Sequence, residues 1–233
     1  LFWDNANNNF GIGTNMPNAT LDVNGDIMAH GITVGLGKGA YITNTALGIN
    51  CLKNITSGEQ NVAMGLHALI YNENGMANTA IGYQTLATNK SGSNNTANGA
   101  LALYSNIDGS SNTVLGYMSM YLNKSGNNNT AVGNMSLFSL DGGLSNTTIG
   151  TMSGFNLTTG GDNTIVGYNS GMGLQTGSGN TIIGASVSGL DPALSNNIII
   201  ADGNGTRRIN VNASGYVGIG TNTPSKLLDV NGE

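Results

Sequence analysis

Residues 78–94 read Asn-Thr-Ala-Ile-Gly-Tyr-Gln-Thr-Leu-Ala-Thr-Asn-Lys-Ser-Gly-Ser-Asn, and this pattern returns every 17 residues along most of the chain. Its first residue, Asn, recurs without an insertion, and a Gly follows four positions later in almost every copy. Positions within a copy are numbered below from this Asn, so that position one comprises Asn44, Asn61, Asn78, Asn95, Asn112, Asn129, Asn146, Asn163, Asn180 and Asn197. A strict period of this kind predicts a fold built from stacked, equivalent units.

Seventeen residues are too few for a repeat that contains a helix or for a propeller blade. They suit one coil of a β-solenoid with two short strands and two turns, whose neighbouring coils pair about 4.8 Å apart. The dipeptides Ser91-Gly92 and Asp108-Gly109 belong to a second Gly column, which predicts tight turns with positive φ. We therefore expect an all-β solenoid of about ten coils over 44–203, with β connector modules at 1–43 and 204–233.

The composition restricts the function classes. The chain has 233 residues with 37 Gly, only 8% charged residues and a net charge of −5. Scarce helix formers argue against a helical or α/β protein, and 39% hydrophobic residues argue against disorder. Seven Lys and Arg residues in total predict no binding to nucleic acid. The single Cys excludes an internal disulfide framework, and no apolar run is long enough to predict insertion into a membrane.

The Asn column predicts a stacked amide ladder. Each side-chain amide can both donate to and accept from the coils above and below it, so the ladder satisfies polar groups that burial would leave unpaired. We expect this column to have a structural role.

Alternation along the strand assigns the two faces. Position four is apolar in nearly every copy and is expected to form the coil core together with the β-branched position two; Asn98 is the one polar residue at position four, and the pattern does not explain it. Position three is also small or apolar, so we expect it to be covered by other copies of the chain. The expected trimer interface is Ala80, Ala97, Val114, Ala131, Ile165 and Ile182.

Four consecutive copies carry an aromatic residue at position ten: Tyr104, Tyr121, Phe138 and Phe155. Because position nine is a Leu column that should point inward, the aromatic side chains are expected on the outside of the coil. They predict either contacts between subunits or a stripe on which sugar rings stack.

Catalytic and metal-binding groups are sparse. A glycosidase needs two carboxylates about 5–10 Å apart, whereas the acidic residues, Asp108 and Asp141 included, fall mostly in predicted turns. His30 and His67 lack partners at metal-ligand spacing, and Cys51 occupies a position held elsewhere by small residues. We expect no enzyme activity, cofactor or metal.

Two further features leave alternatives open. The pair Arg207-Arg208 predicts a surface turn or an ion pair between subunits. A Thr column at position two, from Thr45 to Thr181, makes an ice-binding solenoid a lesser alternative, because flat Thr arrays can bind ice. A glycan-degrading spike with carboxylates shared between subunits is the enzymatic alternative.

The two ends share one module. Residues 11–25 and 218–232 both follow the pattern Gly-Ile-Gly-Thr-x-x-Pro-x-x-x-Leu-Asp-Val-Asn-Gly. Each copy predicts a strand, a turn that contains Pro, and a second strand. No helix or Gly-Lys-Thr follows the glycines, so the motif is not a phosphate-binding loop.

Both the end module and the 17-residue repeat resemble segments of known protein families. The end module resembles a segment of phage tail fibres and related surface proteins that often precedes an endosialidase-type chaperone domain. The Asn-Thr-Ala-Ile-Gly-Tyr repeat, as at 78–83, is similar to the head repeats of trimeric autotransporter adhesins. The resemblance implies a parallel homotrimeric fibre of a virion or cell surface that mediates attachment to a host cell through a glycan or protein receptor.

Overall fold

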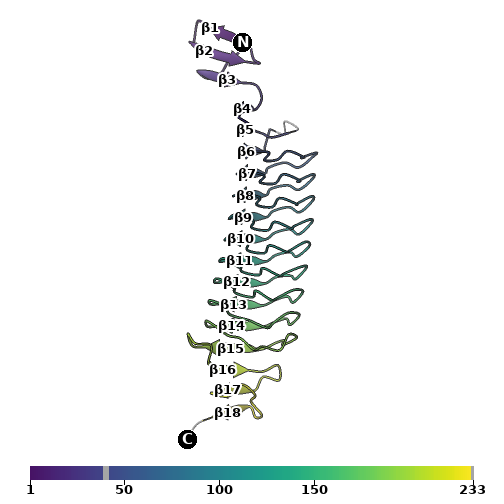
Figure 1. Cartoon of the computed structure of the whole chain (residues 1–233), viewed down its shortest axis with the longest axis vertical. Coiled ribbons are helices and arrows are strands. Elements are labelled where there is room, and N and C mark those ends of the chain that lie inside the picture. Colours follow the sequence, from purple (N-terminus) through teal and green to yellow (C-terminus); the bar gives the residue numbers. More distant parts are fainter. Residues whose placement is uncertain (39–41, 232–233) are drawn as a thin grey trace.

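The computed structural model describes residues 1–38 and 42–231, which form strands and turns without any helix. The all-β prediction is therefore confirmed. At the N-terminal end, a three-stranded sheet contains β1 (Phe2–Asp4), β2 (Asn9–Ile12) and β3 (Leu21–Val23). A second sheet of fifteen strands runs from β4 to β18 in sequence order and gives the molecule its rod shape (Figure 1).

The fifteen-stranded sheet begins with β4 (Ile27–Ala29) and β5 (Ile32–Gly35), which are antiparallel to their neighbours. The solenoid strands follow: β6 (Thr45–Ile49), β7 (Val62–Met64), β8 (Thr79–Ile81), β9 (Thr96–Asn98), β10 (Thr113–Leu115), β11 (Thr130–Val132), β12 (Thr147–Ile149), β13 (Thr164–Val166), β14 (Thr181–Ile183) and β15 (Ile198–Ala201). The sheet ends with β16 (Arg207–Val211), β17 (Val217–Ile219) and β18 (Leu228–Val230).

The solenoid prediction is confirmed, with one difference in the coil. Strands β6 to β15 are parallel, and each residue pairs with the residue 17 positions further on, so ten strands enclose nine coils. Each coil has one strand, and its return side consists of turns. In the coil 112–128, three residues that are not glycine have a positive φ: Met118, Met120 and Asn128. Left-handed residues reverse the chain direction and interrupt extended backbone, which explains why the second predicted strand does not form.

Both Gly columns allow successive coils to approach closely. A Cβ at Gly116, whose φ is +138°, would contact the carbonyl oxygen of Gly133 in the next coil. A Cβ at Gly92 would overlap the carbonyl oxygen of Gly109 in the same way, but the φ of Gly92 is not positive. The predicted positive-φ turns of this second column are therefore wrong, and it is the stacking distance that requires glycine there.

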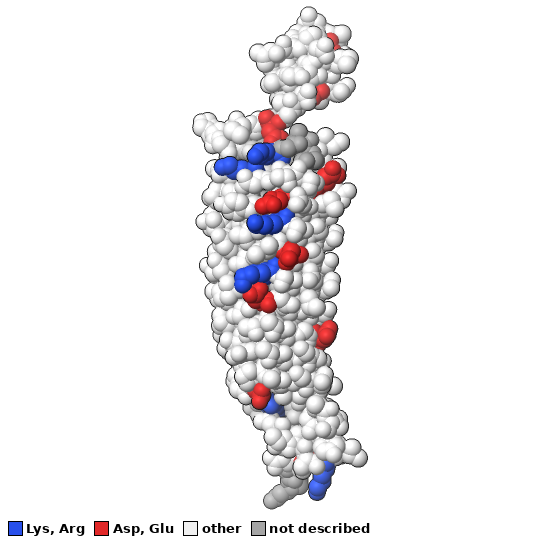
Figure 2. All heavy atoms as spheres, turned by 90° about the vertical axis from the view of Figure 1, so that its right-hand side faces the viewer, with Lys and Arg blue, Asp and Glu red and all other residues white. Residues whose placement is uncertain are grey.

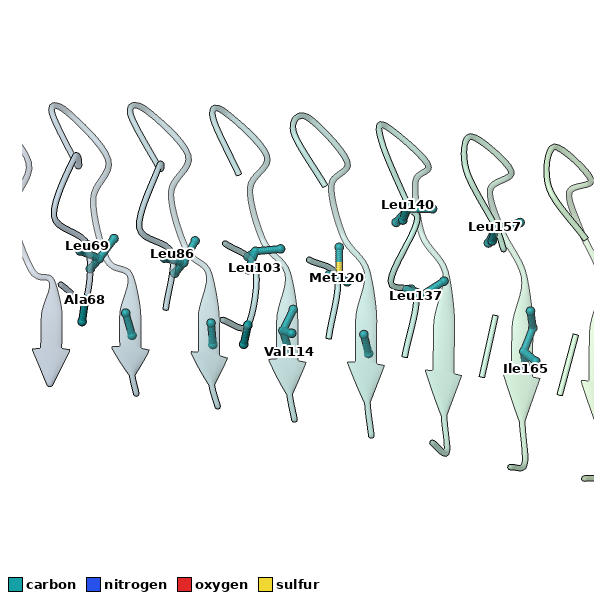
Figure 3. Packing of buried hydrophobic residues seen from close by; sticks show 14 of the residues in the cluster. Ala68, Leu69, Leu86, Leu103, Val114, Met120, Leu137, Leu140, Leu157 and Ile165 are labelled. Carbon is teal, nitrogen blue, oxygen red and sulfur yellow. The ribbon is translucent and has the colours of Figure 1, made fainter. Parts of the chain in front are cut away.

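The coil interior is filled by position three of the strand and by the return side facing it (Figure 3). Where position three is small, as at Ala97, a Leu such as Leu103 fills the coil, and both side chains are fully buried. Where position three is Ile165, the facing position is glycine, and a Cβ at Gly171 would lie only 3.0 Å from Ile165 Cδ1. A small residue on the strand is thus matched by a large residue on the facing return side, and a large one by a glycine, so the coil keeps a constant size.

The sheet extends across both predicted boundaries of the solenoid. Strand β5 pairs with β6 and thus joins 27–35 to the coils, and β16 pairs antiparallel with β15 at the other end. The reversal at β16 explains why ten sequence repeats enclose only nine coils, because the tenth repeat does not continue into another parallel strand.

The duplicated modules have the predicted structure of two strands joined by a turn with a buried Pro. Strand β2 pairs parallel with β3, as β17 does with β18. The Asp22 carboxylate accepts a hydrogen bond from Asn18 N at 2.8 Å, and Asp229 accepts one from Ser225 N at 2.9 Å. The shared aspartate of the module therefore closes the same turn in both copies.

Candidate interaction surface

The predicted Asn ladder is present and fully buried over most of its length. Asn112 shows the repeating contacts: its Nδ2 donates to Asn95 Oδ1 at 3.0 Å and to Gly126 O at 2.9 Å. Its Oδ1 accepts from the backbone N of Asn129 at 3.0 Å and from Asn129 Nδ2 at 3.2 Å. The ladder therefore joins each coil to both neighbours. It also provides the acceptor for the backbone N–H of the next ladder Asn, which makes no hydrogen bond between strands.

A second ladder lies on the return side, where sequence reasoning did not identify it. It consists of Asn72, Asn89, Asn106 and Asn123, all fully buried. Asn89 Nδ2, for example, donates to Asn72 Oδ1 at 2.6 Å and to Gly92 O at 2.9 Å. The signal was available, because these four residues also recur every 17 positions before Leu replaces them in the later coils.

The assignment of the strand faces is reversed in the structure. The six residues expected at the trimer interface point into the coil and are buried to 1% exposure or less by the chain itself: Ala80, Ala97, Val114, Ala131, Ile165 and Ile182. Positions two and four point outward, so Leu115 is 48% exposed and Ile149 is 45% exposed. Period-two alternation separates the faces but does not say which is inside. The interior of the narrow coil has room only for the smaller side chains of position three, because the return side already supplies large side chains.

The outward position four forms one continuous column across the whole sheet, which we call the apolar stripe. Its members are cross-strand partners from β4 to β18: Ile27, Val34, Leu47, Met64, Ile81, Asn98, Leu115, Val132, Ile149, Val166, Ile183, Ile200, Ile209, Ile219 and Val230. Of the fourteen apolar residues, eleven are exposed and three are half-buried. The pairing of β4, β5 and β16 to β18 therefore extends the stripe beyond the coils at both ends.

The area of the stripe is large for a face left to water. If each apolar member exposes on the order of 70 Å², the stripe amounts to about 1,000 Å², compared with the 300–600 Å² of the largest patch on a typical monomer. Further exposed side chains follow at position six, among them Leu66, Tyr83, Tyr117 and Tyr168. The stripe alone matches the roughly 800 Å² that each partner contributes to a standard protein interface.

The aromatic residues at position ten stack on one another along the rod. Ring centroids are 5.2 Å apart for Tyr104 and Tyr121, 5.5 Å for Tyr121 and Phe138, and 5.1 Å for Phe138 and Phe155, with interplanar angles of 8° or less. All four side chains are half-buried. Because neighbouring rings cover one another's faces, the inner rings cannot stack on a sugar, which needs an open face. The stacked rings therefore connect these four coils along the rod.

On the loop side of the coils, acidic and basic side chains neighbour one another and most of the face is uncharged (Figure 2). Lys124 Nζ lies 2.7 Å from Asp141 Oδ2, and Lys90 Nζ lies 3.9 Å from Glu73 Oε1. The Asp141 carboxylate is therefore engaged by a cation one coil away. Such exposed pairs contribute little to stability.

Arg208 binds Asp202 of the same chain, with Nη2 at 2.6 Å from Oδ2. This hydrogen bond holds the pKa of the Asp202 carboxyl below its usual value. Arg208 thus has its partner within the chain, but the arginine pair begins strand β16 and does not lie in the surface turn that the sequence offered as one alternative.

The remaining candidate groups have local partners. His67 Nε2 lies 3.2 Å from Asn50 Nδ2, and the Cys51 thiol donates to Gly48 O at 3.1 Å. Burial raises the pKa of that thiol, which opposes thiolate formation. His30 lies in the turn between β4 and β5. Across 1–38 and 42–231, no three His, Cys, Asp or Glu residues gather in a way that could hold a metal ion.

The apolar stripe is thus a surface feature that runs the length of the fifteen-stranded sheet and that the chain itself leaves uncovered. Comparison with family models, curated proteins and solved structures finds no match. No helix long and apolar enough to cross a membrane occurs in the part of the chain that the structure describes. The functional argument therefore rests on the geometry of the stripe and on the repeat itself.

Proposed function

We propose that this chain is a segment of a homotrimeric fibre, on a virion or a cell surface, that serves attachment to a host cell. The apolar stripe is the observation that carries the proposal. It runs the length of the sheet, repeats once per coil, and needs a partner that is equally long and has the same spacing. Other copies of this chain meet both requirements.

The energetics favour association through this face. Covering about 1,000 Å² of apolar surface per chain at about 25 cal/mol per Å² gives a gross gain of about 25 kcal/mol for each chain. Association and side-chain ordering consume much of that gain, but a rigid solenoid has little backbone entropy to lose. Three copies with their stripes toward one axis would leave the loop sides outward, and these sides carry charged side chains (Figure 2).

Mutation of the stripe tests association without disturbing the coil. Ile149 is 45% exposed in the single chain, so an aspartate there is hydrated in a monomer but buried in a trimer. Ile149→Asp should dissociate the trimer and leave the far-UV circular dichroism unchanged. The matched control is Ser145→Asp in the preceding turn, because Asp162 occupies the same repeat position naturally and both residues have a positive φ of 57°.

Light scattering gives the outcome. The parent and Ser145→Asp should have three times the 23.7 kDa mass of the chain, and Ile149→Asp should have that mass once. A parent protein that is monomeric at micromolar concentration would refute the proposal. Host attachment is tested separately, by binding of the labelled trimer to a glycan array and to cells.

One observation favours a second candidate, an ice-binding face. The Thr column at position two points outward beside the stripe, with Thr96, Thr113 and Thr164 exposed, and not inward as the sequence predicted. A trimer that uses the stripe would cover this column, so the two functions compete for one face. Thermal hysteresis by a monomeric parent protein would favour ice binding.

A further inference from the structure

An interface that repeats once per coil does not by itself fix how two copies of the chain align along the rod. Strands β6 to β15 repeat every 17 residues with equivalent pairing. Two copies that are aligned through their stripes could therefore slip past one another by one coil, about 4.8 Å, and still cover almost the entire stripe. Apolar contacts alone discriminate weakly between these alignments, because most members of the stripe are Ile, Val or Leu.

One member of the stripe is different. Asn98 ends β9, is exposed, and lies between Ile81 and Leu115 as its cross-strand partners. Its backbone pairs like that of the other coils, and its carbonyl accepts from Gly116 N at 2.9 Å. Among the hydrogen bonds of the described residues, none involves its side-chain amide. The side-chain amide of Asn98 thus has no role in the fold of the single chain, whereas every Asn of both ladders uses its side-chain amide in hydrogen bonds.

We propose that Asn98 sets the register of the trimer. When three copies are aligned in register, their three Asn98 side chains meet at the same height on the shared axis. Each Nδ2 can then donate to the Oδ1 of the next copy, which closes a ring of hydrogen bonds. A slip of one coil places each amide against Ile81 or Leu115 of its neighbour and leaves it buried without a partner. A single buried Asn specifies register in coiled coils by the same physical means.

The position of Asn98 also selects the direction of the chains. It is the sixth of the fifteen stripe members, counted from Ile27 to Val230. An antiparallel neighbour with flush ends would therefore place its Asn98 against an apolar residue of the other chain. Only parallel, in-register copies bring the amides together while covering the whole stripe.

Cross-linking measures the register directly. In a Cys51→Ala background, which follows Ala68 at the same repeat position, one chain carries Thr164→Cys and a second chain of different tagged mass carries Thr181→Cys. These positions are cross-strand partners on successive coils. After the two chains are refolded together, mild oxidation should join equal positions by a disulfide when the chains are in register. A disulfide needs Cα atoms no more than about 7 Å apart, and a cysteine one coil away is displaced by a further distance of about 4.8 Å. Links between position 164 and position 181 report a slip of one coil.

The proposal predicts few unequal links with Asn98 present. Asn98→Ile matches Ile81 and Ile149 in the same column. In this variant the slipped alignment no longer buries an unpaired amide, so the fraction of unequal links should rise about tenfold. Val132→Ile is the control, since it alters the stripe without changing its polarity, and it should leave the links unchanged.

This inference rests on the proposed trimer, and the two can fail separately. If Asn98→Ile remains trimeric with links only at equal positions, Asn98 does not set the register, and the trimer stands. If the parent protein is a monomer by light scattering, both proposals fail.

Discussion

Removing one amide from the buried ladder, by Asn112→Ala, tests what holds the coils together. The substitution breaks four hydrogen bonds at once: two that Asn112 Nδ2 donates and two that its Oδ1 accepts. Three of the four partners keep another bond. Asn129 Nδ2 still donates to Gly143 O, Asn95 Oδ1 still accepts from the residue-112 backbone amide, and Gly126 O still accepts from Asn123 Nδ2.

The fourth partner is the backbone N–H of Asn129, which has no acceptor other than Asn112 Oδ1 among the described residues. Asn129 is fully buried, so water does not replace the lost acceptor unless the coil opens. A buried, unsatisfied amide costs about 1–3 kcal/mol, and the weakened bonds at the other three groups bring the expected loss to about 3–5 kcal/mol. Asn112→Ala should therefore be among the most destabilising single changes that leave the core side chains intact.

Urea unfolding followed by circular dichroism, at one protein concentration, measures the total effect. Hydrogen exchange locates it, because the Asn129 amide should lose its protection while amides several coils away keep theirs. The matched control is Asn134→Ala, since Asn134 is exposed and Ala100 occupies the same repeat position naturally. If Asn112→Ala costs no more than Asn134→Ala, the ladder does not stabilise the coils and the reasoning is wrong.

Three further predictions follow from the same structure. Ala131→Asp places a carboxylate inside the coil, where Ala131 is 0% exposed, so it should lower the free energy of unfolding by about 3–5 kcal/mol even in a monomer; an unchanged urea midpoint would contradict the face assignment. Gly171→Leu should lower the melting temperature through its clash with Ile165. Adding Ile165→Ala should restore part of that loss, because it recreates the Leu–Ala pairing of the earlier coils. If the two substitutions lower the melting temperature additively, the large and small residues do not compensate. Hydrogen bonds from Ser225 lower the pKa of Asp229, so this turn is stabilised above the unfolded carboxyl pKa and should open as the pH falls through the lower folded value; a Ser225 amide resonance that does not respond to acid would argue against this.

The sequence alone determined the solenoid architecture and its 17-residue period, although not the number of strands in each coil. Ten Asn residues at a strict spacing leave no room for a helix and make each coil superimpose on the next, so strand register and the amide ladder follow directly. The two strands and the turn of each end module could also be predicted from the sequence, because Pro and Asp at fixed positions specify that turn. These features are local or strictly periodic, and a linear pattern is sufficient to encode them.

The tertiary structure decided which face of the strand is inside. Alternation gives two columns of opposite orientation and nothing that distinguishes inward from outward when both are apolar. That choice depends on what fills the coil from the other side. Leu103 facing Ala97, and Gly171 facing Ile165, leave space for the position-three side chains and none for a second large column. Because packing volume is shared by residues on opposite walls of the coil, only the closed coil reveals that position four, Asn98 included, lies on the surface.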